Sequence, residues 1–337
     1  MPTTAEAPGS PLAVTVAVCT RDRPEDLARC LDALAALRYP GLEILVVDNA
    51  PATRDAQGVV AARPGVRYAV EPRPGLGWAR NRALAEATGE ILAFTDDDVV
   101  VDAGWVEALA AVFQEDAQVG AVTGLVLPLE LETRAQRLFE DYRSFGRGHE
   151  RIHARMSPGA GPVAARYGLT GSFGAGANMA FRRRVLEELG GFDPCLGPGT
   201  LSRGGDDLEM YFRVLKTGHA LVYEPAAVVR HRHRRQMYAL FGQIRDHGTS
   251  FSSYVVRSAI AYPDERWALA RLWVWWLAKL GYRVLVPRRA PAGVMRRLAL
   301  AELIGLLRGI GRYRRARAAL APGGWAGAPE PVLRKGS

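Results

Sequence analysis

Three consecutive carboxylates, Asp96, Asp97 and Asp98, follow a short apolar segment at residues 91–94, with Thr95 between them. Adjacent carboxylates repel one another unless a cation offsets their charge, and Mg²⁺ and Mn²⁺ prefer carboxylate ligands combined with phosphate oxygens. The run therefore predicts a divalent-metal site for a phosphate-bearing ligand. The alternative, a solvated acidic turn, is disfavoured because the apolar segment before it is typical of a buried strand.

A second acid pair, Asp206-Asp207, directly precedes a predicted helix at residues 208–217. A carboxylate at the start of a helix can accept a proton from a reacting hydroxyl, and the helix dipole is expected to keep its pKa low. The alternative is that the two side chains only cap the helix.

Two histidines, His231 and His233, alternate at the end of a predicted strand, so both point to one side. Isolated histidines are most often ordinary surface residues. Here four arginines surround the pair, Arg230, Arg232, Arg234 and Arg235. These cations favour an anion site next to the histidines.

Apolar, β-branched segments predict four strands at residues 14–18, 43–47, 66–70 and 91–94. Helical spacing predicts helices between them at residues 24–37 and 78–88. The alternation predicts an α/β fold with a mostly parallel sheet. Polar residues follow three of these strands, at residues 20–23, 48–49 and 96–98. Because ligands bind at the carboxyl ends of such strands, the first hundred residues predict a nucleotide-type site.

The next part of the chain continues the alternation less clearly. Helices are predicted at residues 105–113, 183–189 and 208–217, and strands at residues 119–127 and 220–229. Residues 130–170 predict a helix and a mobile loop. No internal repeat is visible.

Asp96-x-Asp98 after an apolar strand also fits the haloacid-dehalogenase signature, in which the first Asp is a phosphoryl nucleophile. That signature belongs on the first strand, whereas here other strands precede it. It also requires a later lysine, and residues 99–205 contain none. Similarly, Gly75-x-Gly77 is only a fragment of a dinucleotide-binding motif, since Arg80 replaces the third glycine.

Taken in order, six sequence blocks resemble family 2 glycosyltransferases of the GT-A fold over roughly residues 12–235. The blocks lie at residues 14–24, 45–49, 75–81, 94–98, 174–193 and 205–209. The last one departs from the family's usual Gly-Glu-Asp, because Asp206 replaces the glutamate. The resemblance implies a GT-A catalytic domain with a Rossmann-like central sheet and a bacterial nucleotide-sugar glycosyltransferase.

The resemblance also implies roles for individual residues. Asp98 and His231 would bind Mn²⁺ or Mg²⁺, with the choice between His231 and His233 left open. Asp207 would be the general base, with Asp206 as the other catalytic candidate, and attack opposite the leaving group would invert the anomeric centre. The donor would contact Thr20, Arg21, Arg23, Asp48, Asn49, Gly75, Arg80, Asn81, Asp96, Asp97 and Asn178. Among these, Asp48 would bind the base and Asp96 the ribose.

The charge is unevenly distributed along the 337 residues. The chain carries 44 Lys or Arg against 35 Asp or Glu, a net +9, yet residues 230–337 alone carry 21 against 5, a net +16. Ordinary apolar and charged fractions exclude a wholly disordered chain, and three cysteines exclude a disulfide scaffold. The basic character therefore belongs to the C-terminal third.

Two apolar segments in that third, residues 267–286 and 295–310, carry cations along one side. Such helices either lie on an anionic membrane surface or pack on the catalytic domain or in a homodimer. Cations on one side disfavour a spanning helix, and nucleic acid is disfavoured because no recognition motif accompanies the charge.

The sequence thus predicts a disordered start at residues 1–11, a catalytic domain at 12–235 divided at residue 104, a basic helical extension at 236–320 and a flexible tail at 321–337. The predicted activity is metal-assisted, inverting transfer of a sugar, most plausibly from a UDP-sugar, to a hydroxyl of a glycolipid, polysaccharide or natural product. Alternatives are a nucleotidyltransferase on sugar phosphates and a non-catalytic membrane-associated scaffold. The predicted location is cytoplasmic, with peripheral attachment to the inner face of the membrane through residues 260–320.

Overall fold

The structure is a computed structural model that describes residues 11–157, 159–286 and 291–320. The predicted disordered start, apart from Pro11, and the predicted tail lie outside these residues. The first part of the chain alternates strands and helices, as expected: β1 (Val14–Thr20), α1 (Pro24–Ala35), β2 (Leu42–Asn49), α2 (Asp55–Ala61), β3 (Val66–Glu71), α3 (Leu76–Glu86) and β4 (Ile91–Asp96).

The second part adds shorter elements: β5 (Val99–Val101), α4 (Trp105–Glu115), β6 (Val119–Pro128), α5 (Arg134–Tyr142), β7 (Ile152–Ala154), α6 (Val163–Tyr167), the 3-10 turn η1 (Thr170–Phe173), β8 (Asn178–Arg182), α7 (Arg183–Glu188), α8 (Asp206–Lys216) and β9 (Ala220–His231). The last strand runs two residues further than predicted, so His231 lies within it, paired with Val99 and Pro128. The helix at the acid pair starts two residues earlier than predicted and includes both carboxylates.

The strands form one sheet in the order β3-β2-β1-β4-β8-β6-β9-β5, with β7 paired to β9. The neighbours β3, β2, β1 and β4 are parallel, and so are β6 and β9, whereas β8 is antiparallel to both of its neighbours. This confirms the predicted α/β fold with a mostly parallel central sheet. Its parallel half places the ends of β1, β2 and β4 at one edge.

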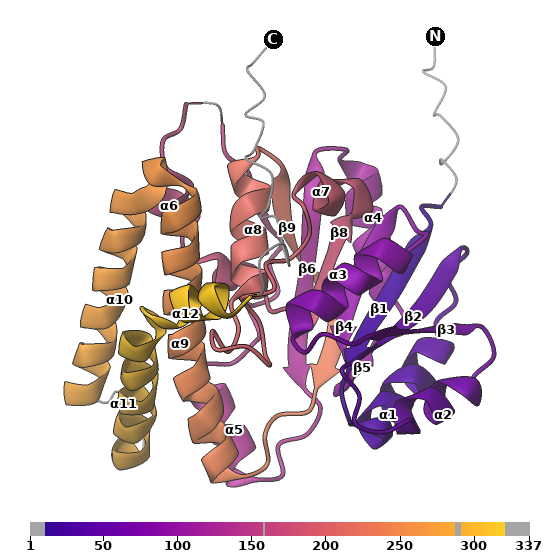
Figure 1. The fold of residues 1–337 in the computed structure, drawn as a ribbon, viewed down its shortest axis with the longest axis horizontal. Helices are drawn as coiled ribbons and strands as arrows, with labels where there is room; N and C mark the ends of the chain where they lie inside the picture. The colour runs from indigo at the N-terminus through magenta and orange to yellow at the C-terminus, as the bar shows by residue number, and fades with distance from the viewer. Residues whose placement is uncertain (1–10, 158, 287–290, 321–337) are drawn as a thin grey trace.

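Alternating side chains divide the core between the two faces of the sheet. On β1, Val16 and Val18 pack with Leu27 and Leu31 of α1, and Ala17 packs on the opposite face. The short apolar runs of the sequence are therefore strands that are covered on both faces, as a parallel sheet requires. Figure 1 shows the sheet with the later helices grouped beside it.

The C-terminal third consists of α9 (Met237–Ala261), the 3-10 turn η2 (Pro263–Glu265), α10 (Arg266–Leu285), α11 (Ala292–Gly309) and α12 (Arg312–Ala319). The longest helix, α9, lies within the predicted helical extension, but no individual helix was predicted there, because glycines and serines weaken its helical pattern. Glycines on both helices allow close packing: a Cβ on Gly248 of α9 would overlap the Glu302 carbonyl oxygen of α11, and a Cβ on Gly305 of α11 would overlap the Arg245 carbonyl oxygen of α9. The two helix backbones therefore lie in direct contact.

Buried ion pairs connect these helices to the catalytic domain. Glu302 of α11 accepts hydrogen bonds from the Tyr142 hydroxyl (2.7 Å) and from Arg143 (2.8 Å), both at the end of α5. Similarly, Arg257 of α9 lies 2.7 Å from Glu209 of α8. The extension thus packs on the catalytic domain, as one of the two sequence-based alternatives expected.

Some apolar side chains of the extension nevertheless face outward. Trp267 is 84% exposed and Val274 58% exposed on α10, and Leu307 is 50% exposed on α11. Within the described residues, no helix combines the length and the apolar character that crossing a membrane requires.

Candidate active site

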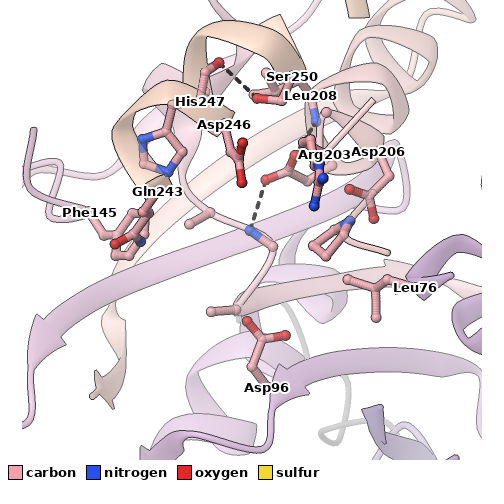
Figure 2. A pocket seen from close by; sticks show the side chains of 18 of the residues that line it. Leu76, Asp96, Phe145, Arg203, Asp206, Leu208, Gln243, Asp246, His247 and Ser250 are labelled. Atoms are coloured by element: carbon pink, nitrogen blue, oxygen red, sulfur yellow. Dashed lines mark hydrogen bonds between the residues drawn. The ribbon is translucent and has the colours of Figure 1, made fainter. Parts of the chain in front are cut away.

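A cavity of about 460 Å³ opens where the carboxyl ends of the strands meet α9. Side chains from separated parts of the sequence line it, as Figure 2 shows for Asp96, Asp206 and Asp246. Its remaining charged residues are Arg80, Arg143, Arg147, Arg203, Asp207, His231, Arg234 and His247. The cavity therefore joins the predicted metal region, the acid pair of α8 and a helix that sequence analysis did not identify.

Asp96, Asp98 and His231 form a group whose potential ligand atoms all lie within 4.8 Å of one another. The Nε2 atom of His231 lies 3.3 Å from a carboxylate oxygen of Asp98. Burial raises the pKa of Asp96 and of Asp98, and it lowers the pKa of His231 to about 4. Two carboxylates beside a neutral imidazole suit a divalent cation, so the group fits Mn²⁺ or Mg²⁺.

A carboxylate–histidine chain stands behind His231. The Nδ1 atoms of His231 and His233 are 3.0 Å apart, and Nε2 of His233 lies 2.7 Å from Glu140 of α5. If His233 donates a hydrogen bond from Nε2–H to Glu140, and its Nδ1 accepts one from the Nδ1–H of His231, then Nε2 of His231 is left free to bind a metal. Such outer partners fix the orientation of metal-binding histidines. Both histidines point to the same side, and His231 is the one beside Asp98.

The Asp97 side chain points away from this group and contacts the end of β1 and the loop that follows it. It accepts hydrogen bonds from the Thr20 hydroxyl (2.8 Å) and from Arg23 (3.1 Å), and Arg23 also lies 3.4 Å from Asp98. Burial and the neighbouring Asp98 charge raise the pKa of Asp97 to about 7. Arg21 is half exposed and pairs only with Asp22 among the described residues.

The end of β2 supplies a polar site on the other side of the sheet edge. Asp48 accepts a hydrogen bond from the Tyr68 hydroxyl (2.8 Å), while its buried Oδ1 has no hydrogen-bond partner among the described residues. Burial raises the pKa of this carboxyl. Asn49 accepts a bond from the amide of Gly75 (2.8 Å), which holds the start of α3 against the β2 end. An unpaired buried acceptor beside a loop is suited to a ligand N–H.

The acid pair of α8 divides into two roles. Asp206 forms a buried ion pair with Arg80, whose guanidinium also donates to the carbonyl of Gly176 (3.2 Å). Asp207 accepts hydrogen bonds from the amides of Gly176 (3.1 Å) and Leu208 (2.8 Å). Since Arg80 already neutralises Asp206, Asp207 is the better proton acceptor of the two.

The expected low pKa of Asp207 is wrong. Burial, together with the adjacent Asp206 charge, raises its pKa to about 6, and this outweighs Arg80 and the backbone N–H groups. Its position depends on Gly205, which has a φ of +88° and lies so close to α9 that a Cβ would come within 2.7 Å of the Ser250 carbonyl oxygen. A close helix contact therefore holds this carboxylate at the cavity wall.

Two of the predicted donor residues form hydrogen bonds within the protein. Asn81 donates to the Phe192 carbonyl (2.8 Å) and accepts from the Phe192 amide (2.7 Å). Asn178 is fully buried; its amide donates to two backbone carbonyls, and its oxygen accepts a bond from the Trp105 indole (2.8 Å). These bonds position both side chains, and their contact with a donor stays a prediction.

Several residues of the site were not found from the sequence. Glu140, Arg143 and Arg147 come from the stretch at 130–170 that was hard to interpret, although its Thr133–Gln136 capping box marks the start of α5. Asp246 and His247 come from the unpredicted α9. Long-range packing, and not local pattern, brings these groups to the cavity.

Comparison with known proteins identifies the family. The family described as "Glycosyltransferase like family 2" matches residues 10–247, which is more than half of the chain. A pre-mycofactocin glycosyltransferase of Mycobacterium tuberculosis is 28% identical over 274 residues, covering 80% of this chain and 53% of that protein. The chain thus spans about half the length of this curated relative.

Two solved structures share the fold. The mannosyltransferase PcManGT from Pyrobaculum calidifontis, in complex with GDP-Man and Mn²⁺, has a TM-score of 0.59 at 19% identity, covering 91% of this chain and 89% of that one. GalNAc-T7 with UDP, GalNAc and Mn²⁺ has a TM-score of 0.50 at 17% identity, covering 74% of this chain and 52% of that one. The chain belongs to glycosyltransferase family 2, and its fold is GT-A-like.

Proposed function

We propose that this member of glycosyltransferase family 2 transfers a sugar from a nucleotide-sugar donor to a hydroxyl group of an acceptor. One observation carries the proposal: a single cavity is lined by Asp96 and His231 of the Asp96–Asp98–His231 group and, on a different element, by the buried carboxylate of Asp207. The two fold neighbours, which bind GDP-Man or UDP together with Mn²⁺, support a nucleotide-sugar donor and a divalent metal. Of the possible donors, a UDP-sugar is our choice.

In this proposal, Asp98 and His231 hold Mn²⁺ or Mg²⁺ together with Asp96, for which the sequence predicted a ribose contact instead. The cation would offset the negative charge of the donor diphosphate as it leaves. Thr20 and Arg23 fix Asp97 beside this group, and the unpaired oxygen of Asp48 accepts a hydrogen bond from the nucleobase. Asn49 positions Gly75 at the start of α3. The donor side is thus assembled from the ends of β1, β2 and β4.

Asp207 then receives the proton of the acceptor hydroxyl. The acceptor oxygen forms a bond to the anomeric carbon, and the bond from that carbon to the diphosphate oxygen breaks, so the nucleoside diphosphate leaves with the electron pair. Attack from the side opposite the leaving group inverts the anomeric centre. A pKa of about 6 suits this role, because the carboxyl is ionised at neutral pH and still basic enough to take a proton.

The test is donor binding and hydrolysis with a panel of nucleotide sugars, in the presence of Mn²⁺ or Mg²⁺. We expect at least one donor to bind in a metal-dependent way. Asp207→Asn should retain donor binding and lose transfer, by roughly 10²- to 10⁴-fold, because only the proton acceptor is removed. Failure of every donor to bind or react would overturn the proposed function, and full activity of Asp207→Asn would overturn its base.

We also propose that residues 260–320 contact an anionic membrane surface on the cytoplasmic side. The support is the outward Trp267, Val274 and Leu307 beside a strongly basic C-terminal third. Flotation of the full chain with anionic vesicles tests this. Trp267→Ser should reduce flotation more than Tyr238→Ser, an equally exposed aromatic on α9 (84% and 77% exposed). Equal flotation of the two variants and the parent chain would overturn this proposal.

A further inference from the structure

A second cavity, of about 210 Å³, adjoins the first and shares Arg203 and Asp246 with it. The described residues that line it are Arg203, Arg245, Asp246, Thr249, Arg308 and Arg312. Four guanidinium groups thus face one carboxylate. We call this group of six residues the arginine pocket.

Packing, and not local sequence, brings these arginines together. Arg245 lies on α9, Arg308 on α11 and Arg312 at the start of α12. The contact of Gly305 with the Arg245 carbonyl and of Gly309 with the Thr249 carbonyl holds α9 and α11 side by side at this level. Arg203 comes from the loop before α8 and has a φ of +64°, an uncommon conformation for a residue with a side chain. Rigid helices and a strained loop residue therefore fix the pocket.

Its positive charge is not balanced within the described part of the chain. Arg203, Arg308 and Arg312 form no ion pair with any described residue, and Arg245 approaches Asp246 only to 3.9 Å. The cations at the buried junction behave differently, since Arg143 and Arg257 each lie within 2.8 Å of a carboxylate. Arg203, Arg245 and Arg308 are exposed and Arg312 is half-buried, so an anion that enters the cavity from solvent can contact their guanidinium groups. The arginine pocket is therefore prepared for a ligand with more than one negative charge.

We propose that the arginine pocket binds a phosphate group of the acceptor, so that the acceptor extends through the shared opening toward Asp207. The planar guanidinium fork matches phosphate oxygens in two-point contacts. A phosphate monoester carries nearly two negative charges at neutral pH, which suits four cations and one carboxylate better than a carboxylate ligand does. The identification of the bound phosphate as part of the acceptor rests on the proposed function, whereas phosphate binding itself does not.

The pocket is separate from the proposed donor site. Asp96, Asp98 and His231, which we expect to lie beside the donor diphosphate, are not among its lining residues. Asp246 lies between the two regions, since it lines both cavities. A donor diphosphate and an acceptor phosphate can therefore bind at the same time without sharing a contact residue of the metal group.

The first test measures binding of inorganic phosphate to the full chain by calorimetry at constant ionic strength. Arg308→Ala combined with Arg312→Ala should weaken phosphate binding by about tenfold or more, because two charge-assisted contacts are lost. Arg314→Ala combined with Arg315→Ala is the matched control: it removes the same charge from exposed positions of α12 outside the lining. The control should stay within about twofold of the parent chain, as expected for distant, screened charges.

A metal-site variant separates this proposal from the proposed function. Asp98→Asn should lose donor binding and keep phosphate binding. If phosphate binding is instead lost in Asp98→Asn, or is unchanged in Arg308→Ala with Arg312→Ala, or is absent from the parent chain, the arginine pocket is not a phosphate site. Failure of all nucleotide sugars with phosphate binding intact would overturn the proposed function alone.

A second measurement identifies the source of the phosphate. Flotation with phosphatidylcholine vesicles, with and without phosphatidic acid, is compared with calorimetric binding of glucose 1-phosphate. Dependence of flotation on phosphatidic acid that Arg308→Ala with Arg312→Ala removes supports a lipid phosphate, and binding of glucose 1-phosphate without dependence of flotation on phosphatidic acid supports a soluble sugar phosphate. If Arg308→Ala with Arg312→Ala responds to phosphatidic acid and to glucose 1-phosphate in the same way as the matched control, the proposal is overturned.

Discussion

Ionic groups are buried in two regions of this molecule, the catalytic cavity and the junction between the catalytic domain and the C-terminal helices. At the junction, each carboxylate lies beside a cation: Glu302 beside Arg143, and Glu209 beside Arg213 and Arg257. At the cavity wall, Asp96 is followed in the chain by Asp97 and Asp98, and burial raises the pKa of all three carboxyls. The first arrangement pairs its charges within the protein, whereas the second gathers like charges whose repulsion a bound cation would offset.

Charges that stabilise the fold and charges that serve activity should therefore respond differently to substitution. A buried pair that loses one partner leaves an uncompensated ion, so substitutions at the junction should lower the free energy of unfolding. A group of like charges is unfavourable in the folded chain, so substitutions in the cavity should reduce the transfer activity and leave the free energy of unfolding nearly unchanged.

The largest effect is expected for Asp98→Asn. Loss of a charged ligand of the metal group should reduce transfer by roughly 10³-fold or more, through lost metal-dependent donor binding. The free energy of unfolding of the metal-free chain should stay the same or rise at neutral pH, because a raised pKa means that the ionised form is unfavourable in the fold. Donor binding by calorimetry and urea unfolding measure the two. A clear loss of stability would show that Asp98 is a structural charge.

Glu302→Ala should have the opposite profile. Removing this carboxylate leaves Arg143 without its partner, which should cost about 3 kcal/mol of unfolding free energy, the lower end for a buried pair because the Arg143 side chain is 28% exposed. Glu187→Ala is the control, since it breaks an exposed pair with Arg183 on one helix turn and should cost less than about 0.5 kcal/mol. Urea denaturation measures both. Equal costs would mean that the junction charges do not hold the extension in place.

Gly305→Ala tests the close packing of α9 and α11. The added methyl would overlap the Arg245 carbonyl oxygen, so we expect a loss of about 1–3 kcal/mol as the two helices separate. Gly281→Ala on α10 is the control, because nothing lies within 4 Å of the added Cβ. It should raise stability by up to about 1 kcal/mol through helix propensity. If both substitutions stabilise the chain, the two helices are not in backbone contact in solution.

The sequence predicts the position of some of these charged groups and misses that of others, and each case has a physical reason. A strand of four apolar residues followed by Asp96 is a local pattern, so both the strand and the position of the carboxylates at its end were predictable. The choice of His231 over His233 as the residue beside Asp98 was open, because it depends on Glu140, which lies 93 residues away from His233. Local alternation could place both rings on one side but could not rank them.

The C-terminal helices show the other limit. Gly248 and the serines of α9 lower its intrinsic helix propensity, yet they permit the contact with α11 that stabilises the helix. The amphipathic character of residues 267–286 was visible, but the same pattern fits a membrane surface and a protein surface. Only its partners identify the packed face: Trp273 donates to the Ser252 hydroxyl of α9, and Arg283 donates to the Tyr142 carbonyl. The raised pKa of Asp207 is likewise a result of burial that a helix-start rule cannot anticipate.

The smallest effect we predict is a pH dependence that belongs to the cavity alone. With a pKa of about 6, Asp207 should be ionised at pH 7, and the transfer rate should fall about tenfold for each pH unit below 6. Because this pKa is raised above its ordinary value of 3.8, the folded chain binds the proton more tightly than the unfolded chain between these two pH values. The contribution of Asp207 to the free energy of unfolding therefore decreases as the pH rises through that window, and Asp207→Asn should abolish the decrease.

The measurement is kcat/KM from pH 5 to 8, with donor binding followed at each pH so that protonation of the metal group is recognised separately. Asp246→Asn is the control, because burial also raises the pKa of Asp246 and its side chain lines the same cavity. If the acidic limb of the profile disappears in Asp246→Asn, then Asp246 is the proton acceptor and Asp207 only a neighbour. If Glu302→Ala moves the limb as much as either substitution does, the separation between structural and functional charge fails, since a junction charge would then set the proton affinity of the cavity.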